Sequence, residues 1–172
     1  MTIETLNLQE PVGGVPNNPL PVVIYRNVIP AETADPADWL EQHLAANDWP
    51  AQWRYIIYDF THFHSNCHEL LGVYAGQSRV QLGGETGPIV ELTKGDVVLV
   101  PAGVGHKALE SSKDFMVVGA YPRGMSADLC RDNPAKLASL QRHIGQVPMP
   151  STDPITGGHG GITTLWHNPE QA

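Results

Sequence analysis

The feature that most constrains this chain is a set of metal-type ligands that comes from two separate stretches. His62 and His64 are two residues apart, and side chains in an extended strand alternate between its faces, so both imidazoles project from one face. Glu69 follows His64 after a short turn, and His106 comes after the Pro- and Gly-containing stretch 101–105. The pattern predicts strands that bring these four side chains to one metal ion.

The expected ligand set limits the metal and what it binds. Three imidazoles and one carboxylate suit Fe, Mn, Zn, Ni or Co, and they leave coordination positions open. We therefore expect one divalent metal ion per chain. With neutral imidazoles and an ionised Glu69, the centre has a net charge of about +1, which favours an anionic ligand with two oxygens. Hydroxy acids, oxalate-like acids, enolates of diketones and sugar enediols all meet that description.

The same spacing resembles the cupin superfamily. The residues that match its first motif are His62, His64, Glu69 and Gly76, and those that match its second are Gly95, Pro101, Gly103 and His106. Ile56 and Glu110 stand where the motifs have glycine and asparagine, neither of which is a metal ligand in the family. The wider run 53–122 also resembles the small YjlB-like bacterial cupins. The resemblance implies a jelly-roll fold with metal ligands at the four positions, and it leaves the reaction open.

The fold that we expect is all-β, a single cupin barrel with two short helices and irregular ends. Its core covers about 53–122, with an N-terminal extension, 1–52, that holds one helix, and a C-terminal helix and tail, 123–172. The 172 residues are enough for one well-packed domain, and 17 glycines and 15 prolines indicate frequent turns. The helices are expected to begin after Asp35 and after Asn133.

Charge and hydropathy narrow the partners. The net charge of −8 disfavours nucleic acid and anionic membranes as partners. The partner that we expect is the small, anionic ligand that the charge of the metal centre favours. No stretch of 18 apolar residues is present, and the N-terminus has no signal-peptide pattern, so we expect a cytoplasmic protein.

The run 53–64 reads as one strand with apolar residues on both faces. In this reading Ile56, Tyr58 and Phe60 share the inward face with His62. Burial on both sides needs a cover on the outer face, and a homodimer formed by sheet packing is the simplest cover. Val22–Tyr25 reads as an edge strand because prolines precede it, and 70–74 with 78–82 reads as a hairpin about Gly76.

Four further side chains are candidates for the site. Tyr58 and Glu110 are candidates for catalysis, with core packing and plain solvation as their alternatives. Arg54 either binds a substrate carboxylate or forms a surface salt bridge. His68 points away from Glu69 by strand alternation, and either supports the site at its rim or is exposed.

Two functions compete at this stage. The first is a metal-dependent enzyme, of dioxygenase, isomerase or lyase type, that acts on a small anionic oxygenated metabolite. The second is a cupin that binds or senses a small molecule without turnover, since no paired carboxylate or His–Asp dyad is evident in the sequence.

Overall fold

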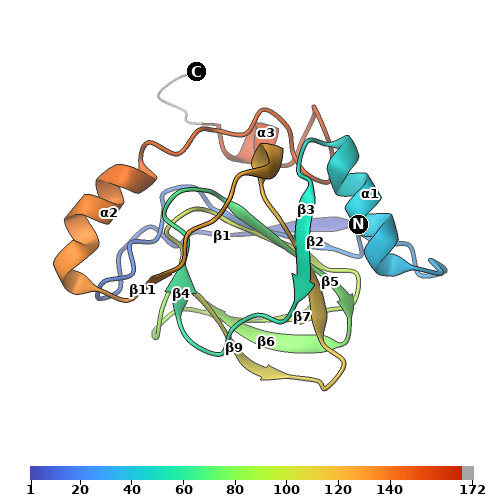
Figure 1. Cartoon of the computed structure of the whole chain (residues 1–172), viewed down its shortest axis with the longest axis horizontal. Helices are drawn as coiled ribbons and strands as arrows, with labels where there is room; N and C mark the ends of the chain where they lie inside the picture. Colours follow the sequence, from blue (N-terminus) through green and yellow to red (C-terminus); the bar gives the residue numbers. More distant parts are fainter. Residues whose placement is uncertain (168–172) are drawn as a thin grey trace.

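The computed structural model describes residues 1–167 and shows two antiparallel β-sheets that face each other (Figure 1). The six-stranded sheet has the order β1-β2-β8-β5-β10-β3, and the five-stranded sheet has the order β11-β4-β9-β6-β7. The strands are β1 (Thr2–Leu6), β2 (Val22–Arg26), β3 (Ala51–Tyr55), β4 (His62–Phe63), β5 (Glu69–Ala75), β6 (Gln77–Leu82), β7 (Ile89–Thr93), β8 (Val97–Val100), β9 (His106–Ser111), β10 (Met116–Ala120) and β11 (Cys130–Arg131). The predicted all-β jelly roll is confirmed.

From β3 onward the chain changes sheet at every connection except the β6–β7 hairpin, so the two sheets form opposite walls of the roll. β5 pairs with β8 and β10, whereas β6 pairs with β7 and β9. Between β5 and β6, Gly76 has a φ of 72°, and a Cβ atom there would lie 2.8 Å from the Cα of Phe115. The turn is where the sequence predicts it, but the expected hairpin is wrong because the chain passes from one sheet to the other.

Side chains at alternate positions of the strands fill the space between the sheets. Val22 and Ile24 of β2 and Val98 and Val100 of β8 belong to one buried apolar cluster, which also contains Val80 of the five-stranded sheet. This cluster is the inner core of the roll.

The outer face of the six-stranded sheet is covered by α1 (Pro36–Ala46) and the C-terminal segment. Val23, Leu99, Leu40 of α1 and Trp166 share a second buried cluster. Figure 1 shows the C-terminal segment crossing from α2 to α3 over this side of the molecule. Strands that are apolar on both faces are thus accounted for within one chain.

Both predicted helices are present. α1 begins directly after Asp35, whose carboxylate accepts a hydrogen bond from the N–H of Asp38 at 3.0 Å. α2 (Leu137–Ile144) follows a 3₁₀ turn, η2 (Pro134–Lys136), and a second such turn, η1 (Pro122–Gly124), follows β10. A short third helix, α3 (Ile162–Leu165), forms in the tail. None of the helices within residues 1–167 is long and apolar enough to cross a membrane.

The single strand expected over 53–64 is wrong. This run forms the end of β3 in the six-stranded sheet and β4 in the five-stranded sheet, joined by the irregular stretch 56–61. The chain must change sheet here to pair His62 with His106. Tyr55 and Tyr58 are exposed, so the run is not buried on both faces, and the homodimer stays a prediction.

Val22–Tyr25 is a strand, but the prediction that it lies at an edge is wrong. β2 has β1 on one side and β8 on the other, so β1 is the edge strand. The prolines precede β2 and leave its own N–H groups free to pair on both sides. The six-stranded sheet therefore takes two strands from the region expected to be an N-terminal extension.

Candidate metal centre

Three histidines of the five-stranded side converge within the roll. His62 in β4 is the register partner of His106, the first residue of β9, and their ring centroids are 4.1 Å apart. His64 lies just beyond the end of β4, with its ring centroid 5.4 Å from that of His106. One ligand nitrogen from each residue lies within 4.8 Å of the others, and all three residues are buried. The three imidazoles can therefore hold one metal ion.

Main-chain carbonyls set the tautomer of each imidazole. The three Nδ1 atoms contact the carbonyl oxygens of Phe60 (from His62, 2.9 Å), Val104 (from His106, 3.1 Å) and Asp128 (from His64). A carbonyl only accepts hydrogen bonds, so Nδ1 carries the ring proton in each case. This leaves the three Nε2 lone pairs as the available ligands, which is how metal-binding histidines are usually supported.

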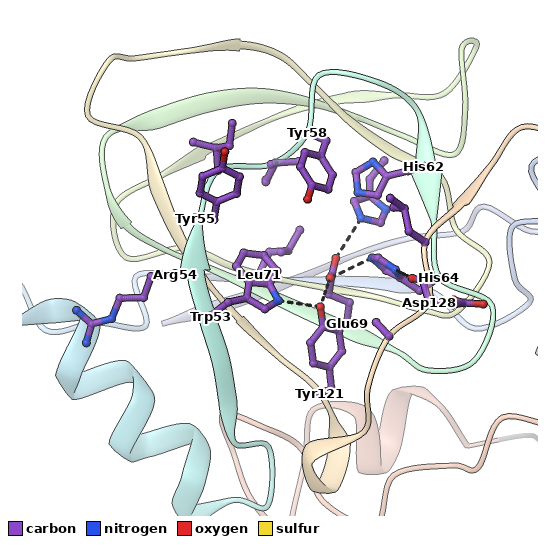
Figure 2. Close-up of a pocket in the computed structure, with 15 residues that line it drawn as sticks. Trp53, Arg54, Tyr55, Tyr58, His62, His64, Glu69, Leu71, Tyr121 and Asp128 are labelled. Carbon is purple, nitrogen blue, oxygen red and sulfur yellow. Dashed lines mark hydrogen bonds and ion pairs between the residues drawn. The ribbon is translucent and has the colours of Figure 1, made fainter.

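A carboxylate comes from the opposite sheet. Glu69, the first residue of β5, lies with Oε1 3.1 Å from Nε2 of His106 and Oε2 3.0 Å from Nε2 of His64. Tyr121, just after β10, donates its hydroxyl to Oε2 at 2.8 Å (Figure 2). Burial alone would raise the pKa of Glu69, but the imidazoles of His64 and His106 hold that pKa far below its usual range. The carboxylate is therefore ionised, and the centre joins the two sheets.

One buried polar atom of this centre is unmatched. Nε2 of His64 has no hydrogen-bond partner among the described residues, although a Glu69 oxygen lies 3.0 Å from it. Burial and the adjacent His106 lower the pKa of His62 to about 3, so its ring is neutral. Burial acts to lower the pKa of His64, but Glu69 raises it above its usual value, so either a proton or a metal cation between Nε2 and the carboxylate matches the pair. The donor set fits a divalent cation such as Fe, Mn, Zn, Ni or Co.

These four residues, called the metal centre below, form the floor of a cavity. The cavity has a volume of about 410 Å³ and opens to solvent. Trp53, Leu71 and Tyr121 line it together with residues of 54–58 and 127–129. Figure 2 shows the aromatic side chains of Trp53 and Tyr58 placed around the space above Glu69. The volume is at the lower end of the range for small-molecule sites, so the cavity suits a small ligand.

Comparison with curated proteins identifies the family. The chain is 36% identical over 155 residues to the uncharacterized protein YjlB of Bacillus subtilis, a match that covers 90% of this chain and 91% of that protein. This chain belongs to the YjlB family. No family model matches the sequence.

Solved structures also resemble this YjlB-family chain, at low identity. A DUF861 family protein from Thermotoga maritima is 22% identical, with a TM-score of 0.35, and the match covers 57% of this chain and 96% of that one. The QdtA 3,4-ketoisomerase of Thermoanaerobacterium thermosaccharolyticum, solved in complex with TDP, is 15% identical, with a TM-score of 0.42, and the match covers 54% and 75%. At these scores the assignment of the fold rests on the sheet topology described above.

Of the four other candidates, Tyr58 and Arg54 both line the cavity, but only Tyr58 directs its polar group into it. The Tyr58 ring lies edge-on to His62, with centroids 5.4 Å apart, and the residue is 41% exposed at the cavity mouth. The guanidinium of Arg54 turns outward and pairs with Glu41 of α1. Figure 2 shows the Arg54 side chain directed toward this helix. The surface salt bridge, the alternative considered for Arg54, is the one observed.

Glu110 and His68 also lie outside the cavity. The Glu110 side chain is 77% exposed and lies 4.0 Å from Arg79 on the outer side of β9. His68 is buried on the face opposite to Glu69, where its Nδ1 accepts the N–H of Ala102 and its ring packs on Trp166. Strand alternation placed His68 correctly on the face opposite to Glu69, but both roles considered for it are wrong: the C-terminal segment covers His68, so it is neither at the rim of the cavity nor exposed.

Two residues with clear roles are not evident from the sequence. Tyr121 orients Glu69, and its hydroxyl accepts a hydrogen bond from Nε1 of Trp53 at 2.9 Å. Asp128 supplies the carbonyl that His64 contacts, and its carboxylate accepts hydrogen bonds from the N–H and hydroxyl of Ser65. Both follow the last long strand and reach the centre only through long-range folding. A tyrosine that ends a buried strand is the one available signal.

Proposed function

We propose that this protein binds one divalent metal ion per chain through His62, His64, Glu69 and His106, and acts as an enzyme on a small anionic oxygenated metabolite. The observation that carries the proposal is the convergence of three Nε2 lone pairs and one ionised carboxylate at the floor of an accessible cavity. A bound divalent ion would supply Lewis acidity to oxygens of the ligand.

The protein's own groups fix the geometry of this centre. The carbonyls behind the three imidazoles hold their Nε2 atoms inward, and the Tyr121 hydroxyl holds Glu69. One carboxylate against a dication leaves a charge of about +1, which an anionic ligand neutralises. The surrounding apolar walls exclude water and strengthen these interactions.

Tyr58 is the side chain that we assign to proton handling or substrate orientation. Its ring lies at the cavity mouth beside His62, and Figure 2 shows its hydroxyl directed into the cavity. No hydrogen bond of this hydroxyl is recorded within residues 1–167, so the group is available to a ligand. The type of reaction, whether that of a dioxygenase, an isomerase or a lyase, depends on which metal is bound.

Binding without turnover is the second candidate, and one observation favours it. Besides the metal centre, Asp128 is the one acidic residue that lines the cavity in the described part of the chain, and Ser65 engages its carboxylate. Apart from the Tyr58 phenol, a carboxylate or imidazole that is separate from the metal ligands and free to act as general base is therefore missing from the lining residues.

Elemental analysis of protein purified without added metal or chelator tests the proposal. We expect near one metal ion per chain in the wild type and in His159→Ala, a control at an exposed histidine of the tail, and little in His62→Ala and His106→Ala. Equal metal content in all four proteins, or none in any after titration, would overturn it. Tyr58→Phe then separates the candidates, because an enzyme loses turnover while a binding protein has none to lose.

A further inference from the structure

The charged groups around the cavity are unusual for a site that takes an anionic ligand. Among the residues that line it, Arg54 is the one with a permanently cationic side chain. Its guanidinium pairs with Glu41 and lies 5.8 Å from the ring centroid of Tyr74, outside the cavity. Figure 2 shows it directed toward α1. The guanidinium of Arg131, which does not line the cavity, is stacked on the ring of Phe60 at 3.7 Å. No cationic side chain among the lining residues is therefore directed at a ligand beside the metal centre.

Asp128 adds negative charge beside the cavity. This carboxylate accepts hydrogen bonds from the Ser65 hydroxyl and N–H, and its residue lines the cavity. A divalent ion with Glu69 has a charge of about +1, so one negative charge on the ligand completes neutralisation. Any further anionic group of the ligand would meet no cationic side chain among the lining residues and would lie near the Asp128 carboxylate.

The walls above the metal centre are largely apolar and aromatic. Trp53, Ile57, Tyr58, Leu71 and Leu129 line them. Tyr58 and Leu129 are 41% and 53% exposed at the mouth, so a bound molecule would cover surface that water now contacts. Burial of apolar surface against such walls stabilises a ligand with an apolar body.

From the charges around the cavity and its apolar walls we infer that the ligand is a singly charged, bidentate oxygen chelate with an apolar or aromatic body, and not a phosphorylated metabolite. This inference rests on the proposed metal centre and narrows the substrate class it accepts. The chelating oxygens lie at the floor, toward Glu69 and the three imidazoles, and the body lies between Trp53, Tyr58 and Leu129.

Three hydroxamates with one chelating head and different bodies test the inference. Acetohydroxamate has a methyl body, benzohydroxamate a phenyl body and phosphoglycolohydroxamate a phosphate. Calorimetric titration into the metal-loaded protein should show benzohydroxamate binding at least about tenfold tighter than acetohydroxamate, because the phenyl ring buries apolar surface. Phosphoglycolohydroxamate should bind no tighter than acetohydroxamate.

A matched pair of variants links the preference to the wall. Leu129→Arg places a cation at the cavity mouth, whereas Leu165→Arg makes the same change at an exposed position of α3. We expect Leu129→Arg to improve phosphoglycolohydroxamate binding at least about tenfold and to weaken benzohydroxamate binding. Leu165→Arg should keep the wild-type order of affinities.

The outcomes separate this inference from the proposed function. Metal bound at the centre with phosphoglycolohydroxamate as the tightest ligand, or with no gain from the phenyl ring, overturns the inference alone. Absence of metal, or a loaded centre that binds none of the three hydroxamates, overturns the proposed function and the inference with it.

Discussion

Two buried carboxylates in this protein have opposite surroundings. Asp153 accepts hydrogen bonds from the Tyr25 hydroxyl and from the N–H groups of Ile155, Thr156 and Ile162. Each of these donors carries a proton in the neutral folded protein. Glu69 has one such donor, the Tyr121 hydroxyl, and otherwise faces imidazole nitrogens whose rings already hold their proton on Nδ1. Asp153 is satisfied by main-chain and hydroxyl donors, whereas Glu69 depends on a cation, either a protonated imidazole or a metal ion.

The difference separates a structural anchor from a functional site. Asp153 ties the C-terminal segment to β2 through Tyr25, beneath the cover of the outer sheet face. Burial and the adjacent carboxylate raise the pKa of the Tyr25 hydroxyl well above its ordinary value, so the donor stays protonated. A buried polar group without a matching partner is costly, and a centre that retains one is a candidate for ligand binding.

The largest expected effect is a loss of stability on removing the anchor. Asp153→Ala leaves four buried donors without their acceptor, so we expect the free energy of unfolding to fall by about 4 kcal/mol. The melting temperature should fall by roughly 10 °C, measured by calorimetry on metal-free protein. Metal bound per folded chain should stay at the wild-type level.

Asp59→Ala is the control for this change, because Asp59 is exposed and should be replaceable without effect. A small shift in melting temperature for Asp153→Ala, similar to that of the control, would mean that the C-terminal segment is held by its apolar contacts alone.

The second prediction concerns Glu69, where we expect metal affinity to change more than stability does. Glu69→Gln removes a ligand and a charge, and its amide can donate to Nε2 of His64 or His106. We expect metal affinity to fall on the order of 100-fold, measured by competition with a chelator. The melting temperature of the metal-free variant should fall by less than that of Asp153→Ala, because the Gln amide keeps the contact with the Tyr121 hydroxyl and can still pair with an imidazole nitrogen. A fall as large as that of Asp153→Ala would contradict the comparison.

The sequence predicts the four residues of the metal centre because local rules place them. Alternation puts His62 and His64 on one face, and the turn before β9 brings in His106. Alternation fails across 53–64 as a whole, since it assumed one strand through this run, and the break at 56–61 resets which face each side chain occupies. Tyr121 could not be assigned a role in advance, because its contact with Glu69 depends on the pairing of β10 with β5.

What covers the outer face of the six-stranded sheet also could not be predicted from the sequence. Two-sided apolar patterns in β2 and β8 indicate a cover, but the pattern does not say what the cover is. The chain itself supplies it, with Leu40 of α1 and Trp166 of the C-terminal segment, which are distant in sequence from the strands they contact. The identity of such a partner is a property of tertiary structure, to which local periodicity is blind.

The third prediction concerns Asp128, which lies behind the metal centre and contacts His64. The Asp128 carboxylate accepts the Ser65 N–H at 2.7 Å and thereby fixes the segment whose carbonyl contacts His64. Asp128→Ala should loosen that imidazole and lower metal affinity about tenfold, with little change in the melting temperature of the metal-free protein. Ser65→Ala, which removes one of the two Ser65 donors, should have a smaller effect in the same direction. Wild-type metal affinity in Asp128→Ala would show that the main chain holds His64 without this clamp.

The smallest expected effect is at Glu110, the acidic candidate whose side chain is exposed and lies outside the cavity. Its side chain is 77% exposed, and an exposed pair with Arg79 at 4.0 Å contributes little because water and salt screen it. Glu110→Gln should leave metal content and hydroxamate affinity unchanged and shift the melting temperature by less than about 1 °C. Once a substrate is known, turnover should also be unchanged, since a general base must reach the ligand and Glu110 is absent from the cavity lining. A marked loss of turnover in this variant would place chemistry on the outer face of the five-stranded sheet, and the separation between the metal centre and the rest of the molecule would no longer hold.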